Sequence, residues 1–198
     1  MDNNDRTLAS YDEHVEDYTN SLQPQIHVQF RSWIDRALGL IQPGAEILEV
    51  GSGPGREADY IESRGFRVTR TDASKGFTEY LSKKGKSVKL LNVLTDELGE
   101  NLAMVLAQAV LHHFDEQQFR NVLASIHVAL KPGGLVVFSV KQGDGDGWTK
   151  ERIDAPRYYN FWQKNDLQKV VEKAGFKVLE ISEADLGKTR WLLVTARK

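Results

Sequence analysis

The chain has 198 residues with 26 Lys and Arg against 28 Asp and Glu, so it lacks the basic character typical of nucleic-acid-binding proteins. The length suits one α/β domain with a substantial core, and no apolar run is long enough to span a membrane. The chain has no cysteine, which excludes disulfides, cysteine zinc ligands and a cysteine nucleophile, and its polar, acidic N-terminus does not resemble a signal peptide, so a cytoplasmic protein is predicted.

The first 42 residues predict a helical cap segment ahead of the main domain. Residues 1–7 are polar and are expected to be disordered. A helix is predicted over residues 8–20 and a second over 26–40, because apolar side chains recur every three or four positions. The first apolar stripe consists of Leu8, Tyr11, Val15 and Tyr18. This stripe either folds over a ligand or packs on the domain, and the sequence leaves both interpretations open.

A short apolar strand at residues 47–50 leads into a glycine-rich loop and then a helix that begins near Arg56. Gly51, Gly53 and Gly55 let the backbone turn sharply and approach a ligand closely. A dinucleotide fingerprint needs a glycine where Arg56 stands. Glu49, which we expect at the mouth of the site, would repel a pyrophosphate but attract an ammonium or sulfonium group. The loop therefore predicts a cationic nucleoside rather than a dinucleotide.

The second strand, predicted over residues 66–71, ends in an acidic residue that suits a ribose. Asp72 lies about 20 residues beyond the first glycine, the spacing at which a nucleoside ribose needs a hydrogen-bond acceptor. Ser74 can cap the helix predicted over residues 75–84, which leaves Asp72 available for the ligand. NAD enzymes use the same position, so Asp72 indicates a nucleoside without saying which one.

Five further strands complete the predicted sheet, and two more helices are predicted between them. Strands are predicted at residues 88–91, 102–107 and 135–140, and helices over 115–130 and 166–174. The fifth strand follows the turn Lys131-Pro132-Gly133-Gly134. Two closing strands are predicted at residues 176–181 and 191–196.

Several of these segments, taken together, resemble the class I S-adenosylmethionine-dependent methyltransferases. Glu49-x-Gly-x-Gly-x-Gly55 resembles motif I of that family, and Leu130-Lys-Pro-Gly-Gly134 is another of its recognisable segments. The segment 108–114 resembles the family's Ala-x-x-x-Leu-His-His-Leu segment. The chain departs from the family pattern at Asn92, where an Asp is usual, and at Leu102-Ala103, where Phe-Asp is common.

The resemblance implies an α/β, Rossmann-like fold and a cofactor. The expected sheet has seven mixed strands in the order 3-2-1-4-5-7-6, the last one antiparallel, with helices on both faces and one domain over residues 1–198. S-adenosylmethionine is the implied cofactor, and S-adenosylhomocysteine is its product. The implied cofactor-binding residues are Tyr18, Glu49, Gly51, Ser52, Gly53, Gly55, Asp72, Ala73, Asn92, Val93, Leu94, Gln108, Ala109 and Val110.

Residues 142–162 interrupt the alternation of helices and strands. This segment contains three spaced glycines and five aromatic residues. A loop of this length in a small domain is typical of a lid or binding loop, so it is predicted to form an acceptor wall. In the alternative interpretation, its aromatic rings complete the core.

The predicted reaction is an in-line transfer of the sulfonium methyl to an O, N or S nucleophile of a small organic acceptor. His113, His112 and Tyr159 are the candidate catalytic residues, with His113 preferred as the one facing the site and His14 as a further candidate base. A mechanism by proximity alone stays open, and no metal is expected. Two other functions stay open as well, a non-catalytic S-adenosylmethionine-binding protein and a nucleotide-dependent oxidoreductase. The expected partner is the small-molecule acceptor, with no membrane or nucleic acid, and the protein is expected to be a monomer or homodimer.

Overall fold

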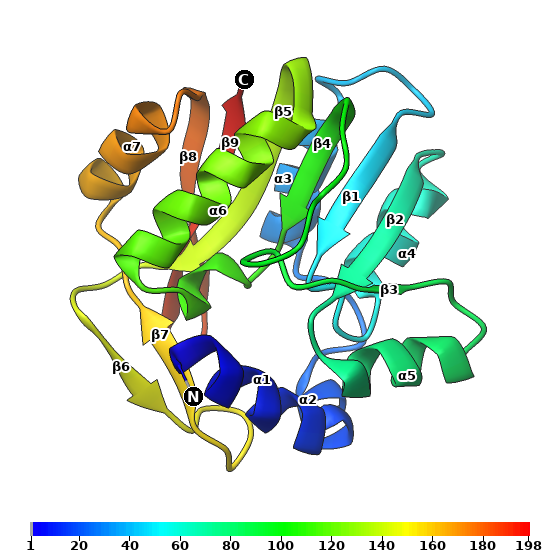
Figure 1. Ribbon diagram of the computed structural model, residues 1–198, viewed down its shortest axis with the longest axis vertical. Coiled ribbons are helices and arrows are strands. Elements are labelled where there is room, and N and C mark those ends of the chain that lie inside the picture. The colour runs from blue at the N-terminus through cyan, green and yellow to red at the C-terminus, as the bar shows by residue number, and fades with distance from the viewer. Residues whose placement is uncertain (1) are drawn as a thin grey trace.

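Seven strands form one mixed sheet in the order β3-β2-β1-β4-β5-β9-β8 in the computed structural model, which describes residues 2–198 (Figure 1). The strands from β1 to β5 pair in parallel, whereas β9 runs antiparallel to both β5 and β8. Counted within this sheet, the order is the predicted 3-2-1-4-5-7-6 with an antiparallel final strand. The predicted fold class is therefore confirmed.

The elements have the following bounds. The strands of the sheet are β1 (Glu46–Val50), β2 (Arg67–Asp72), β3 (Lys89–Leu90), β4 (Leu102–Ala107), β5 (Leu130–Lys141), β8 (Lys177–Leu186) and β9 (Thr189–Arg197). The helices are α1 (Asn3–Glu13), α2 (Val15–Ser21), α3 (Val28–Leu38), α4 (Arg56–Ser63), α5 (Lys75–Lys83), the 3-10 turn η1 (Leu111–His113), α6 (Glu116–Ala129) and α7 (Lys164–Lys173). A separate two-stranded sheet consists of β6 (Asp146–Thr149) and β7 (Arg157–Asn160).

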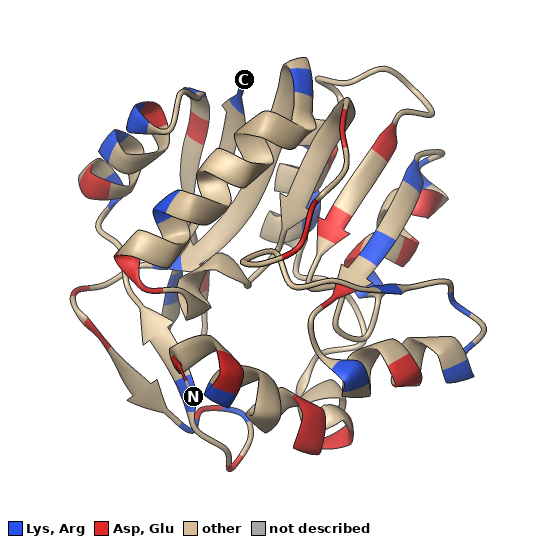
Figure 2. Ribbon diagram, viewed as in Figure 1, with Lys and Arg blue, Asp and Glu red and all other residues tan. Residues whose placement is uncertain are grey.

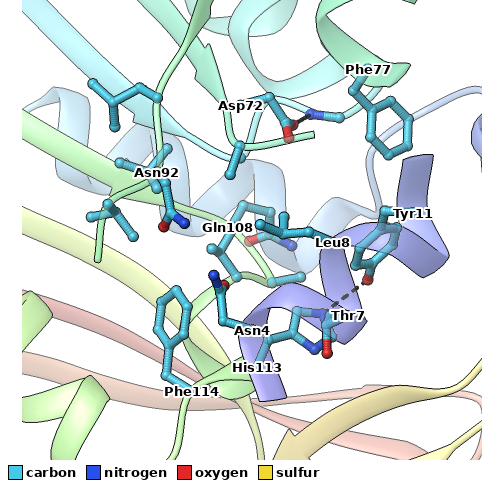
Figure 3. Close-up of a pocket in the computed structure, with 18 of the residues that line it drawn as sticks. Asn4, Thr7, Leu8, Tyr11, Asp72, Phe77, Asn92, Gln108, His113 and Phe114 are labelled. Atoms are coloured by element: carbon cyan, nitrogen blue, oxygen red, sulfur yellow. Dashed lines mark hydrogen bonds between the residues drawn. The ribbon is translucent and has the colours of Figure 1, made fainter. Parts of the chain in front are cut away.

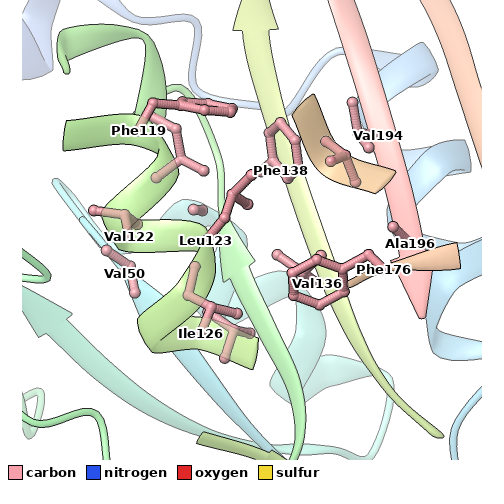
Figure 4. Packing of buried hydrophobic residues seen from close by; sticks show 14 of the residues in the cluster. Val50, Phe119, Val122, Leu123, Ile126, Val136, Phe138, Phe176, Val194 and Ala196 are labelled. Atoms are coloured by element: carbon pink, nitrogen blue, oxygen red, sulfur yellow. The ribbon is translucent and has the colours of Figure 1, made fainter. Parts of the chain in front are cut away.

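Two hydrophobic cores cover the two faces of the sheet because side chains alternate along each strand. In β4, Val105 and Ala107 join the core beneath α6 and α7, whereas Met104 and Leu106 join the core beneath α3 and α4. Figure 4 shows the first core, where α6 packs Phe119 and its neighbours against β5 and β9. A central parallel strand buried on both faces needs an apolar run of this kind, which explains why the sequence predicted β4 well.

The first residues of the chain are helical, so the prediction of disorder for residues 1–7 is wrong over the part that the structure describes; Met1 lies outside it. Helix α1 begins at Asn3 because Asp2 and Asp5 form a reciprocal capping box. A kink at His14 then divides the single helix predicted over 8–20 into α1 and α2. Figure 1 shows both helices lying across the carboxyl ends of the central strands.

The segment 142–162 is an ordered hairpin rather than an irregular loop. Strands β6 and β7 pair antiparallel, with Trp148 opposite Tyr158. Aromatic side chains favour strands, which explains the departure from the predicted loop. Trp162 belongs to the core beneath α6, where its ring lies 4.8 Å from that of Phe119, so this aromatic residue does not belong to a lid.

Charged residues of both signs are mixed on the outer helices. Figure 2 shows acidic and basic residues interspersed along α5 and α7. These helices therefore present no surface of a single charge, in keeping with the balanced composition of the chain.

Candidate cofactor pocket and active site

A pocket lies at the carboxyl ends of the central parallel strands, beneath α1 and α2 (Figure 3). Ligands of open α/β sheets bind at this edge, outside the carboxyl ends of the strands. The side chains of α1 point into the pocket from the side opposite the sheet. The lining residues are Asn4, Thr7, Leu8, Tyr11, Tyr18, Val50, Gly51, Gly53, Asp72, Ala73, Phe77, Leu91, Asn92, Val93, Gln108, Ala109, Val110, His113 and Phe114.

The glycine loop forms one wall of this pocket with bare backbone. Gly51 has φ +69°, and a Cβ built there would lie 2.4 Å from Cγ2 of Val110. Both its conformation and its surroundings therefore require glycine. Gly53 also has a positive φ, and its N–H donates to Oδ2 of Asp72 at 2.8 Å. The loop is thus held against the end of β2 rather than left mobile.

Asp72 is buried between the glycine loop and the start of α5. Its two carboxylate oxygens accept from the N–H groups of Gly53 and Ser74, at 2.8 and 2.9 Å. Ser74 caps α5 with its own hydroxyl, as predicted. Burial nevertheless raises the pKa of Asp72 to about 6, and these hydrogen bonds offset only part of the effect. The carboxylate therefore positions the loop as well as facing the pocket.

Glu49 lies behind the glycine loop, so the expectation that it stands at the mouth of the site is wrong. Its side chain is 2% exposed and accepts from the Ser52 hydroxyl at 2.5 Å. Side-chain alternation along β1 directs Glu49 to the same face as Ile47, which α3 and α4 cover. Burial raises the pKa of Glu49 to about 8, and the neighbouring carboxylates of Glu57 and Asp72 add to the shift. A cation near the loop would lower this pKa.

Of the other predicted cofactor residues, some line the pocket and some do not. Leu94 packs against the core, Gly55 is the N-cap of α4, and Ser52 lines a neighbouring cavity rather than the pocket. The amide oxygen of Asn92 accepts from the N–H of Leu94 at 3.1 Å. Residues of the predicted set that do line the pocket are Tyr18, Gly51, Gly53, Asp72, Ala73, Asn92, Val93, Gln108, Ala109 and Val110.

Helix α1 is tied down at both sides of the pocket. On one side, Oδ1 of Asp12 accepts from the Ser74 hydroxyl at 2.6 Å and from the N–H of Gly76 at 3.0 Å. On the other side, the Thr7 hydroxyl accepts from the N–H of Tyr158 in β7 at 3.1 Å. Tyr11 also packs edge-on against Tyr18, with ring centroids 5.3 Å apart. These contacts make α1 a roof over the pocket.

The sequence analysis missed several lining residues, of which Asn4 and Thr7 come from α1; Leu8 and Tyr11 of the same helix belong to the stripe for which folding over a ligand was one of the two interpretations. The capping pattern of Asp2 and Asp5 was the signal that could have extended the helix to Asn4 and Thr7. Phe77, Leu91 and Phe114 carried no local signal, because their place in the pocket depends on how distant elements pack.

His113 lines the pocket, and both of its ring nitrogens are hydrogen-bonded. Nδ1 lies 2.6 Å from the carbonyl oxygen of Tyr158, which can only accept, so Nδ1 carries the proton. Nε2 therefore accepts from the Tyr11 hydroxyl at 2.9 Å (Figure 3). Burial lowers the pKa of His113 to about 3. His113 is thus a neutral imidazole that fixes the orientation of Tyr11.

His112 faces a second, smaller cavity next to the pocket. Its Nδ1 is buried and has no hydrogen-bond partner among the described residues. Burial lowers the pKa of His112 well below its usual value, and His113, Lys141 and Arg157 act in the same direction. Tyr159 lines the same cavity, and burial raises its pKa to about 12. His14 lines neither cavity and bonds to the carbonyl oxygen of Ser10 at 3.0 Å.

Within residues 2–198, no three or more His, Cys, Asp or Glu side chains are grouped so that they could hold a metal ion. Over the same residues, none of the helices has the length and apolar character needed to cross a membrane.

Comparisons with known proteins place the chain among methyl-transferring proteins. A family model described as a methyltransferase domain matches residues 22–181. A ubiquinone biosynthesis O-methyltransferase from Rickettsia canadensis is 24% identical over an alignment of 170 residues, and the match covers 75% of this chain and 70% of that protein.

Two solved structures share the fold. One is the 1,6-didemethyltoxoflavin-N1-methyltransferase of Burkholderia thailandensis, crystallised with 1,6-didemethyltoxoflavin and S-adenosylhomocysteine. It matches with a TM-score of 0.73 and 23% identity over 96% of this chain and 84% of that one. The other is a SAM-dependent methyltransferase from Methanosarcina mazei, with a TM-score of 0.72 and 13% identity over 88% of this chain and 98% of that one.

Proposed function

Because the chain belongs to the family of methyltransferase domains, we propose that it transfers the methyl group of S-adenosylmethionine to an O, N or S nucleophile of a small organic acceptor. The observation that carries this proposal is one pocket in which the glycine loop, Asp72 and the rings of Tyr11 and Tyr18 meet at the carboxyl ends of the strands. The related Burkholderia enzyme, crystallised with S-adenosylhomocysteine, supports the choice of cofactor.

The residues of the pocket fit a cationic nucleoside. Asp72 has lone pairs left for ribose hydroxyls, since each oxygen accepts only one backbone hydrogen bond. Leu91, Asn92 and Val93 would border the base, and the loop at Gly51 and Gly53 would border the methionyl part. The buried carboxylates of Glu57 and Asp72 lie close enough to raise the pKa of the buried Glu49, so a positive charge at the loop is favourable.

The chain's own residues act mainly by positioning and by excluding water. Bound S-adenosylmethionine supplies an activated methyl group on a sulfonium ion. Tyr11 and Tyr18 roof the pocket and offer aromatic faces, which stabilise a nearby cation. His113 holds the Tyr11 hydroxyl in place. The hairpin of β6 and β7, within residues 142–162, forms the acceptor wall, and residues 2–42 of the predicted N-terminal segment 1–42 form the cap. This arrangement positions the acceptor for in-line attack.

His112 is a better candidate for a general base than His113. Both nitrogens of His113 already have partners, whereas Nδ1 of His112 has none among residues 2–198. A neutral imidazole can accept a proton from an acceptor hydroxyl or amine as the methyl group is transferred. If the acceptor is already deprotonated, no base is needed and proximity alone suffices. Tyr159 stays protonated at neutral pH and is therefore a donor rather than a base.

The two alternative functions are less well supported. A nucleotide-dependent oxidoreductase would need a pyrophosphate beside Glu49 and Glu57, two buried carboxylates. A non-catalytic S-adenosylmethionine-binding protein would need no acceptor site, whereas this chain has a second cavity beside the cofactor pocket with the His112 imidazole facing it.

The test is to compare ligands by calorimetry and to identify what the purified protein retains. We expect S-adenosylmethionine and S-adenosylhomocysteine to bind in the micromolar range and NAD to bind much more weakly. Mass spectrometry of the denatured protein should detect one of the two adenosyl compounds. NAD binding tighter than S-adenosylhomocysteine would refute the proposal, and binding without turnover over a broad panel of acceptors would favour the non-catalytic alternative.

A further inference from the structure

The second cavity adjoins the cofactor pocket and has a strongly polar lining. It is small, about 30 Å³, roughly the room that two water-sized groups need. It shares Tyr11, Tyr18 and Ala109 with the pocket, so a group bound in it would lie beside the cofactor. Its other lining residues are His112, Lys141, Arg152, Arg157, Tyr159 and Trp191.

Arg157 is a buried guanidinium without an anionic partner in the described chain. Its exposed fraction is 1%, and its Nε and Nη2 atoms have no hydrogen-bond partner among residues 2–198. Its one hydrogen bond is from Nη1 to the Tyr11 hydroxyl, at 3.4 Å. The rings of Tyr11 and Tyr159 lie 5.4 and 5.7 Å from its Cζ. Aromatic faces alone do not replace the hydration that a charged group loses on burial.

Arg70 shows how the same chain buries an arginine with a structural role. Its exposed fraction is 5%, and it forms salt bridges of 2.7 Å with both Asp59 and Glu62. Arg157 has a comparable burial and no such carboxylate. The contrast indicates that the partner of Arg157 is not part of the described chain, because an isolated buried charge is costly.

Other groups around the cavity would also suit an anion. The indole Nε1 of Trp191 is buried and has no hydrogen-bond partner within the described residues, and it can only donate. Lys141 adds a second cation, whose Nζ is 2.5 Å from the exposed carboxylate of Glu151 and 3.9 Å from the ring of Tyr159. With Arg152 included, three cations and one carboxylate surround the cavity, so its net charge is positive.

We propose that the methyl acceptor carries a carboxylate, which Arg157 and the indole N–H of Trp191 bind in this cavity. The inference rests on the proposed function and narrows its substrate class to organic acids. A carboxylate matches the fork of a guanidinium and can accept from the indole as well. The acceptor's nucleophile would then lie toward Ala109, which borders both cavities.

The carboxylate of the cofactor itself is a less suitable partner for Arg157. The glycine loop borders the pocket and a larger neighbouring cavity of about 360 Å³, and Arg157 lines neither of them. The larger cavity has its own cation beside the loop, Arg56. Arg56 also pairs with Glu57 at 3.2 Å, and Arg152 is a second cation that lines the larger cavity. The methionyl group therefore has positive charges available in the cavity that the loop borders.

The experiment measures the preference for a carboxylate over its uncharged amide. Protein saturated with S-adenosylhomocysteine is titrated with benzoate and benzamide, phenylacetate and phenylacetamide, and propanoate and propanamide. We expect the acid to bind at least about tenfold more tightly than the amide in one or more pairs, as one charge-assisted bond allows. Equal affinities within all three pairs would overturn the inference.

Variants assign the preference to Arg157 and Trp191. Arg157→Gln should abolish the preference and Arg157→Lys should keep part of it, while affinity for S-adenosylhomocysteine stays within about threefold. Trp191→Phe keeps the ring, loses the N–H and should reduce the preference severalfold, which provides a second test if Arg157→Gln does not fold. The matched control is Arg36→Gln, an exposed arginine paired with Glu180, which should change neither affinity.

Two further results would count against the inference. If Arg157 has only a structural role, Arg157→Met should be strongly destabilised and should keep the preference for the acid. If Arg157 binds the acceptor, the melting temperature of Arg157→Met should be unchanged or higher. If Arg157→Gln weakens S-adenosylhomocysteine binding instead, the guanidinium binds the cofactor. If the wild-type protein binds no S-adenosylhomocysteine, the proposed function is refuted. The affinities for the acid and amide pairs are then measured on the cofactor-free protein, and they test this inference separately.

Discussion

Replacing Glu49 with Gln removes a buried carboxylate and keeps its shape, and we expect the variant to be more stable than the wild type at neutral pH. Burial raises the pKa of Glu49 from 4.5 to about 8. Between these values the folded protein holds a proton that the unfolded chain has lost. Stability therefore falls as the pH rises through this range, because the folded state binds more protons.

The size of the effect follows from that range. Each pH unit is worth about 1.4 kcal/mol, so at pH 7 Glu49 costs the folded state about 3 kcal/mol relative to a neutral residue. The Gln variant should recover much of this, and for a chain of this length the melting temperature should rise by about 6 to 12 °C. Below pH 4.5 the two proteins should have equal stability, since Glu49 is then protonated in both states.

The assay is thermal and urea unfolding of both proteins between pH 4 and pH 9. Glu46→Gln, on the same strand but exposed, is the matched control and should show no such pH dependence. Calorimetry should also show weaker binding of S-adenosylmethionine to Glu49→Gln. A bound cation lowers the pKa of Glu49, so the wild-type side chain can ionise and attract it, whereas Gln cannot. A stability difference that is the same at pH 4.5 and pH 8 would refute the reasoning.

Three other predictions test the pocket and its walls. Asp72→Ala should weaken S-adenosylhomocysteine binding at least about tenfold, since charge-assisted bonds to ribose are worth about 1.5–3 kcal/mol each. Asp72→Asn keeps one acceptor and should lose less affinity. Unchanged affinity in a folded variant would place Asp72 outside the site. Gly51→Ala should lower the free energy of unfolding by about 1–2 kcal/mol because of the positive φ alone, and by more because the new Cβ would clash with Val110. In a double-mutant cycle, Val110→Ala should partly relieve that clash. Tyr159→Ala should cost about 3–5 kcal/mol because the ring is buried, whereas Trp148→Ala, 38% exposed, should leave the melting temperature nearly unchanged; equal stability losses would contradict this difference.

The sequence by itself determined the sheet and the glycine loop. The apolar run of β4 and the alternation of its side chains are properties of consecutive residues, and so is the conformational freedom that Gly51 needs. The spacing from Gly51 to Asp72 is also local, since it spans a single strand–helix–strand unit. These local properties predicted the strands and the glycine loop, whereas the strand order and most of the predicted pocket residues came from the resemblance to a known family.

The tertiary structure alone decided how the polar side chains are used. The two bonds of His113 go to Tyr11 and Tyr158, which are 102 and 45 residues away. The burial of Glu49 depends on the helices that cover β1, and the lack of a partner for Arg157 depends on every element around it. Hydrogen bonding, burial and pKa are set by neighbours in space, and a sequence pattern records only neighbours along the chain.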